Sequence, residues 1–219
     1  MSCPQNVRWV SALMMAAVAL VPGCSRKSTQ SPDPAERIKA VEKLEQDKTP
    51  DAVQAIAPLV RDLDVKVACR AVLALGRTQR AEAVAHIKAA ATDARPEVRE
   101  AAAHAMGELR EQADVPVLLD TVRNAVENEN VRAAAAKSLG RLDVWDAMPT
   151  LLDAMADPSA KVRGQAYAAV RMIMQRDFGF RAEGPDAERQ RIINRIRKEY
   201  PSMEARHADY VRRMKGRSL

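Results

Sequence analysis

The sequence contains few of the residues from which enzymes and metalloproteins usually build their sites. Its 219 residues include 3 histidines, 3 cysteines and 8 glycines, and aromatic residues make up 3% of the chain. No two histidines are four residues apart, and no Cys-x-x-Cys, glycine-rich phosphate loop or Gly-x-Ser-x-Gly turn occurs. We therefore expect no catalytic residue, no metal site and no cofactor, and a core of alanine, leucine and valine.

Long apolar runs are also scarce, and a short one lies near the N-terminus. Residues 9–21 form an uncharged, mostly apolar run of 13 residues that follows Arg8. A helix of this length spans about 20 Å, which is too short for a hydrocarbon core of about 30 Å. A short apolar run after a positive start is typical of a secretory signal peptide.

The sequence that ends this run, Leu20-Val21-Pro22-Gly23-Cys24, resembles the lipobox of bacterial lipoproteins. Pro22 departs from that motif, in which alanine, serine or threonine is common. The resemblance implies that residues 1–23 are a cleaved signal peptide and that Cys24 becomes lipidated. It further implies, because Ser25 follows, an anchor on the periplasmic side of the outer membrane. A plain cleaved signal and an uncleaved anchor are the alternatives.

This interpretation also bears on the role of the third cysteine and of the segment that follows the signal peptide. If Cys3 leaves with the signal and Cys24 carries lipid, Cys69 is the only thiol left and the mature chain has no internal disulfide. We interpret Cys69 as a small packing residue rather than a reactive thiol. Residues 24–34 are polar and contain proline, as expected of a flexible tether.

Most of the chain consists of a repeated helical pattern. Five copies start at residues 36, 67, 98, 131 and 162, so the spacings are 31, 31, 33 and 31 residues. Apolar residues recur at positions 0, 4, 7 and 8, as on one face of a helix, most clearly in the copies that start at 67, 98 and 162, whereas the copy at 36 is weaker. A second helical pattern follows in each repeat. A period of this length indicates stacked helix pairs.

Glycine and proline mark expected helix boundaries within the repeats. Glycine stands at position 9 of the three inner copies, where we expect its left-handed backbone to end the helix (Gly76, Gly107 and Gly140). Pro116 and Pro149 share a position that predicts the first turn of the second helix. Pro58 falls later in its copy and predicts a kink.

The segments Asp93…Val98-Arg99 and Asp157…Val162-Arg163 resemble HEAT-like repeats, of the short type also found in phycobilisome lyase subunits. The resemblance covers roughly residues 35–176 and implies an all-α, right-handed α-solenoid of about five helix pairs. It also implies a ladder between repeats, made by Asp93, Arg99, Asp157 and Arg163. Ala68 and Val126 replace ladder residues in the middle copies, which predicts an interrupted ladder.

The C-terminal residues 177–219 lose the period and become basic. From residue 181 onward there are 11 Lys/Arg and 6 Asp/Glu, whereas residues 24–180 have equal numbers of each sign. We expect a basic helical cap on the last repeat, with one helix over 187–200 and another beginning at Pro201, capped by Ser202. A basic amphipathic helix on a membrane surface is the alternative.

These features favour a lipid-anchored, non-catalytic scaffold that binds an unidentified protein. The resemblance places the Val-Arg helix of each pair on the concave side, and its solvent-facing positions predict six contact residues: Arg70, Arg77, His104, Glu108, Lys137 and Arg141. Trp145 is expected to cover a helix junction. The alternatives are an enzyme subunit resembling the bilin lyases and a structural cell-envelope protein. A neutral repeat array and an export signal argue against nucleic-acid binding.

Overall fold

The computed structural model describes residues 28–215, and every regular element in that range is a helix. Five long helices are α2 (Pro34–Asp47), α4 (Val65–Thr78), α6 (Pro96–Leu109), α8 (Glu129–Arg141) and α10 (Ala160–Met174). Between them lie shorter helices and 3-10 turns, namely α3 (Pro50–Ile56), η1 (Ala57–Arg61), η2 (Ala81–Ala83), α5 (Val84–Ala90), η3 (Gln112–Asp114), α7 (Val115–Arg123), η4 (Trp145–Ala147) and α9 (Met148–Ala154). The last helix is α11 (Asp186–Lys215).

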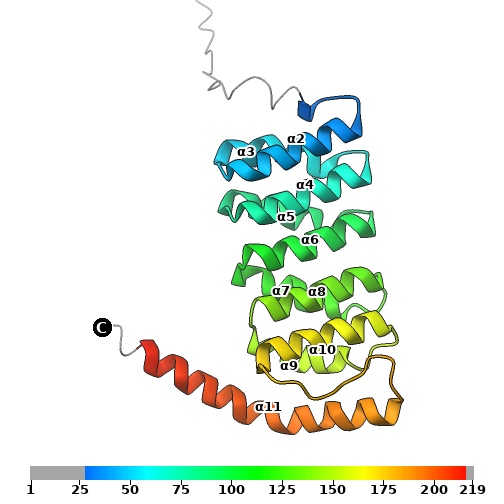
Figure 1. Cartoon of the computed structure of the whole chain (residues 1–219), viewed down its shortest axis with the longest axis vertical. Helices are drawn as coiled ribbons and strands as arrows, with labels where there is room; N and C mark the ends of the chain where they lie inside the picture. The colour runs from blue at the N-terminus through cyan, green and yellow to red at the C-terminus, as the bar shows by residue number, and fades with distance from the viewer. Residues whose placement is uncertain (1–27, 216–219) are drawn as a thin grey trace, which may run out of the picture.

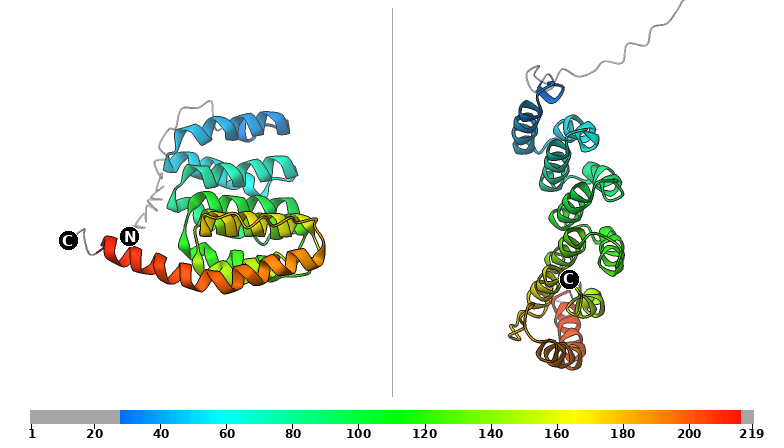
Figure 2. Two further views of the ribbon diagram at one scale, coloured as in Figure 1. Left: turned by 60° about the horizontal axis from the view of Figure 1, so that its bottom comes forward. Right: turned by 90° about the vertical axis from the view of Figure 1, so that its right-hand side faces the viewer.

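The long helices stack side by side in chain order and form one layer, whereas the short helices form a second layer behind them (Figures 1 and 2). Each long helix contacts the long helices before and after it, as well as the short helices next to it in sequence. This arrangement confirms the α-solenoid that the 31-residue period predicts. Equivalent residues of successive repeats therefore occupy equivalent places in the stack.

Polar caps and prolines set where the helices begin. The Asp33 and Asp64 carboxylates accept first-turn backbone N–H groups of α2 and α4, over 2.9 and 2.8 Å. Pro116 and Pro149 lie in the first turns of α7 and α9, as predicted. Helix α3 ends at Ile56, and the residues around Pro58 form the 3-10 turn η1, which confirms the predicted interruption.

The core runs continuously along the stack between the two layers and is made mostly of small aliphatic side chains. The valines that begin the last four copies are buried (Val67, Val98, Val131 and Val162). Leucine, isoleucine and methionine from the short helices pack against them, for example Ile87, Leu118 and Leu151. Small alanines between the long helices allow those helices to approach closely.

Residues 175–185 and helix α11 cover the last repeat (Figure 1). Phe178 and Phe180 are buried, and the Phe178 backbone N–H donates to the Tyr167 hydroxyl on α10 over 2.7 Å. In the first half of α11, Ile193 and Ile196 are completely buried, and this helix packs on α9. The segment thus supplies the apolar contacts that a further repeat would have made.

Helix α11 corrects the predicted break at Pro201. One helix runs from Asp186 to Lys215 with Pro201 inside it, and the Ser202 hydroxyl donates to the Glu199 carbonyl instead of capping a new helix. The helix bends near its middle and its outer half leaves the stack (Figure 1). Proline bends a helix and removes one backbone hydrogen bond, but flanking turns preserve its continuity.

Trp145 joins the outer half of α11 to the repeats. Its ring stacks on the His207 ring, with centroids 5.3 Å apart and planes 24° apart. Trp145 is the first residue of η4 and His207 belongs to α11, so the contact joins these two elements. Trp145 thus covers a helix junction, as the sequence suggested.

The predicted signal peptide of residues 1–23, the lipidation site Cys24 and the first part of the 24–34 tether lie outside the described residues. Within residues 28–215, none of the helices combines the length and the apolar character needed to cross a lipid bilayer.

Candidate protein-interaction face

The long-helix face is held together by glycine contacts, which corrects the role predicted for those glycines. Gly76, Gly107 and Gly140 lie inside their helices, and α4 and α6 end two residues later. A Cβ on Gly76 would come within 2.8 Å of the Ala105 Cα, and one on Gly140 within 2.6 Å of the Ala169 Cα. The glycines therefore permit close helix–helix approach, and they do not terminate helices.

Other residues adopt the left-handed backbone that was expected of these glycines. Positive φ values between 45° and 58° occur near the ends of all five long helices, at Lys48, Gln79, Arg110, Asp143 and Gln175. Each residue lies just beyond a helix whose last turn is packed against its neighbours. Tertiary packing therefore imposes a backbone conformation that glycine would adopt at less cost.

Of the predicted ladder residues, Asp93 and Asp157 lie between helices, whereas Arg99 and Arg163 lie in the first turns of α6 and α10. Arg99 donates to the Asp93 backbone carbonyl over 2.8 Å, and Arg163 makes the same bond to the Asp157 carbonyl. The carboxylates of the two aspartates bind other arginines: Asp157 pairs with Arg132, and Asp93 pairs with Arg95. The bonds of Arg99 to Asp93 and of Arg163 to Asp157 therefore lie within one repeat (a short helix and the long helix after it), and the Arg132–Asp157 pair joins two repeats.

The ladder is also continuous where the sequence predicted an interruption. Arg99 donates from Nε and Nη2 to both oxygens of Glu127, over 2.8 and 2.7 Å. Glu127 follows Val126 directly, so the two-residue insertion supplies the missing carboxylate one position later. Arg99 lowers the Glu127 carboxyl pKa through these hydrogen bonds.

The second expected gap, at Ala68, is bridged from both sides. Arg37 donates to both oxygens of Asp62, over 2.7 and 2.8 Å. Arg95 donates from Nη1 to the Asp62 backbone carbonyl over 2.7 Å. Arginines of the preceding and following repeats thus replace the one missing at Ala68, and the ladder connects successive repeats.

Several of the six predicted contact residues form ion pairs between neighbouring long helices. Arg70 and Arg77 of α4 both pair with Glu45 of α2, over 2.8 and 3.1 Å. Arg141 of α8 pairs with Glu108 of α6. A shallow hollow of about 340 Å³ includes Arg77 and Glu108 in its wall, so charges of both signs meet there.

The other two predicted contact residues, His104 and Lys137, lie on adjacent helices and make no hydrogen bond or ion pair to any other residue in the described range. Burial lowers the pKa of His104, and the positive charges of Lys137 and Arg141 lower it further. Glu100 and Glu108 act on the His104 pKa in the opposite direction. The Lys137 ammonium of α8 remains a positive charge without an ion-pair partner among the described residues.

Residues 28–215 contain no group of three or more histidine, cysteine, aspartate or glutamate side chains placed to hold a metal ion. Cys69 is half-buried, and burial raises the pKa of its thiol. A raised pKa disfavours the thiolate, which is the reactive form.

Comparison with known proteins agrees with this geometry. The family model for HEAT repeats matches residues 56–127 and 125–178. The chain belongs to the HEAT repeat family. The aspartate–arginine edge and the stacked long helices described above are the structural features that repeat along this HEAT array. A search of curated proteins found no match.

Solved structures show the same HEAT fold. The complex of CpcE and CpcF of phycocyanin lyase from Nostoc sp. PCC7120 contains a chain with 22% identity and a TM-score of 0.59, covering 79% of this chain and 71% of that one. An engineered protein matches at 18% identity with a TM-score of 0.51, covering 81% and 95%. At these identities the similarity extends to the fold alone.

Proposed function

We propose that the protein is a non-catalytic scaffold, lipid-anchored at Cys24, whose long-helix face binds another protein. The observation that carries the proposal is the unpaired Lys137 beside His104, on a face where Arg70, Arg77 and Arg141 are held in ion pairs. An unpaired charge at the centre of a rigid surface favours a partner with a complementary carboxylate.

The rigidity of this face supports the same interpretation. Each long helix is fixed to the next by a glycine contact or an alanine-lined interface, and the ladder fixes the turns. A preorganised surface loses little conformational entropy on binding. The solved HEAT relative is itself a complex of two proteins, which is consistent with a binding role for such an array.

Charge reversal at the face tests the proposal. Lys137→Glu should abolish co-purification of the partner, because it replaces the unpaired positive charge without breaking an ion pair of the folded chain. Asp120→Lys, on the exposed surface of α7, is the matched control and should leave co-purification unchanged. Unchanged co-purification with Lys137→Glu would exclude this part of the face from the contact.

An enzyme subunit resembling the bilin lyases is the second candidate, because the Nostoc structure with the same fold is a phycocyanin lyase complex. Such a subunit binds a tetrapyrrole during its reaction. Purified protein that carries visible absorbance from a bound chromophore would favour this candidate over the scaffold.

A further inference from the structure

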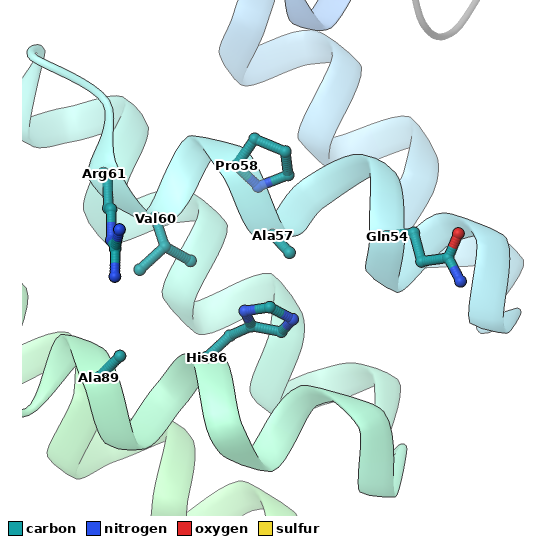
Figure 3. A pocket seen from close by; sticks show the side chains of 7 residues that line it. All are labelled: Gln54, Ala57, Pro58, Val60, Arg61, His86 and Ala89. Carbon is teal, nitrogen blue, oxygen red and sulfur yellow. The ribbon is translucent and has the colours of Figure 1, made fainter.

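The short-helix layer contains a second concave site, between η1 of one repeat and α5 of the next. A cavity of about 460 Å³ is lined there by Ala57, Val60, Ala89 and other residues of both elements (Figure 3). Its volume falls within the range of sites that bind small ligands or single peptide side chains. It lies on the layer opposite to the face described above.

Two sequence features of the first repeats account for this cavity. Pro58 replaces the last turns of a regular α-helix by the 3-10 turn η1. Across the gap, α5 presents Ala89, whose side chain is a single methyl group. At the same repeat position, α7 and α9 carry the larger Asp120 and Asp153. Because the 3-10 turn η1 is narrower than an α-helix and Ala89 opposite it is small, space remains between the two repeats.

The residues that line the cavity include one charged side chain, that of Arg61, and no carboxylate. Arg61 lies at one end of the cavity and the His86 ring rises from α5 toward η1, while Val60 and Ala57 form the apolar wall between them (Figure 3). Neither Arg61 nor His86 makes a hydrogen bond or ion pair to any residue within 28–215. The nearest carboxylate in sequence, Asp62, is occupied by Arg37.

The junction between α7 and α9 provides an internal comparison. A hollow of about 270 Å³ lies there, and its arginines are already paired. Arg123 donates to the Thr150 hydroxyl over 2.8 Å, and Arg132 pairs with Asp157. The hollow also contains Asp153, so carboxylates oppose the binding of a further anion. An unsatisfied basic group above an apolar wall therefore distinguishes the η1–α5 cavity from this junction.

We propose that the η1–α5 cavity binds a segment of a partner protein in which an apolar side chain adjoins a carboxylate. The apolar side chain would contact Val60, Ala57 and Ala89. The carboxylate would accept hydrogen bonds from Arg61, whose planar guanidinium suits two-point contact, and from His86. The inference is independent of the long-helix face, because the two sites share no residue.

Methyl NMR of the full chain in detergent micelles tests this site with the peptide Ac-Ala-Leu-Glu-Leu-Ala-NH₂. The peptide should cause saturable shifts at the Val60, Ala57 and Ala89 methyls. Ac-Ala-Leu-Gln-Leu-Ala-NH₂, which has the same shape without the charge, should bind about ten-fold more weakly. Equal binding of the two peptides, or no saturable shift at these methyls, would overturn the proposal.

Variants locate the contact. Arg61→Gln should weaken the glutamate peptide about ten-fold and leave the glutamine peptide unchanged. Ala89→Leu, at an exposed helix position, should fill the cavity and abolish the shifts of the remaining methyls. Arg123→Gln at the α7–α9 junction is the matched control and should bind like the unaltered chain. Unaffected binding by both Arg61→Gln and Ala89→Leu would also contradict the site.

Discussion

Gly140 of α8 lies directly against Ala169 of α10, so that a Cβ built on Gly140 would come within 2.6 Å of the Ala169 Cα. No pair of carbon atoms packs at that distance without movement of the backbone. The same relationship joins Gly76 of α4 to Ala105 of α6, two repeats earlier in the stack. The glycines of the repeat therefore set the separation of the long helices.

Replacing Gly140 by alanine should destabilise the fold although alanine is the better helix former. The added methyl group has to push α8 and α10 apart, which costs about 1–3 kcal/mol by analogy with overpacked cores. Urea unfolding followed by circular dichroism measures this loss as a lower midpoint.

Gly164→Ala is the matched control for this substitution. Gly164 lies in α10, and its Cβ would meet only the Ala182 Cβ at 3.7 Å, an ordinary contact. Because alanine has a higher helix propensity than glycine, Gly164→Ala should raise the free energy of unfolding by up to about 1 kcal/mol. If both substitutions stabilise the chain, the close-approach role of Gly140 is wrong.

The Arg99–Glu127 pair should contribute measurably to stability because both partners are mostly buried and joined by two hydrogen bonds. Glu127→Gln should lower the free energy of unfolding by roughly 1–2 kcal/mol. Asp120→Asn serves as the control, because its contact with Arg123 is 4.0 Å long and exposed, and it should change stability by less than about 0.5 kcal/mol. Equal effects of the two substitutions would contradict a structural role for Glu127.

The same carboxylate gives a pH dependence with a defined sign. The Glu127 pKa lies below its ordinary value of 4.5 in the folded chain, because Arg99 donates to the charged form. The stabilisation is therefore present above about pH 4.5 and is lost as the pH falls through the folded-state pKa. The Glu127→Gln chain should lose less stability than the unaltered chain between pH 5 and pH 3, as urea titrations at each pH will show.

His104 should destabilise the fold at mildly acidic pH. Burial and Lys137 lower its pKa below the ordinary 6.5, so the unfolded chain binds this proton more tightly than the folded chain. Stability is thus full above about pH 6.5 and falls as the pH decreases through the folded-state pKa. An NMR titration of the imidazole should give a pKa below 6.5, and Lys137→Gln should raise it. A titration that Lys137→Gln leaves unchanged would remove Lys137 as a cause.

The lipid anchor is tested separately from the fold. Cys24→Ala removes the thiol that would carry the lipid, so the protein should move from the membrane pellet to the soluble fraction after cell fractionation. Ser25→Ala leaves the thiol in place and should remain in the pellet. Sedimentation of Cys24→Ala with the membranes would contradict lipid anchoring at this residue.

The repeat period alone was sufficient to predict the fold. Apolar positions 0, 4, 7 and 8 locate the buried face of α4, α6, α8 and α10, and Val98 and Val131 are buried as that pattern requires. In α2 the pattern is weaker, because Glu36 and Lys43 stand at positions 0 and 7 and are exposed. Pro58 and Pro149 likewise act at the positions where the sequence places them. These features are local, because each depends on residues a few positions apart in one chain segment.

The mistaken predictions concern contacts between repeats. Gly140 indicates a helix end when only its own helix is considered, but the decisive neighbour, Ala169, is 29 residues later. Glu127 completes the ladder from a position shifted by the insertion, so a fixed spacing missed it. At Pro201 the flanking turns outweigh a local breaker. Such effects depend on three-dimensional proximity, which one sequence does not display.

Site-specific photo-crosslinking in intact cells tests the central claim, that the long-helix face binds a protein, most directly. A photoreactive amino acid at position 137 should yield one defined adduct with a partner protein, and the same amino acid at the exposed position 120 of the short-helix layer should not. An adduct from position 120 alone, or no adduct from position 137, would contradict the assignment of this face.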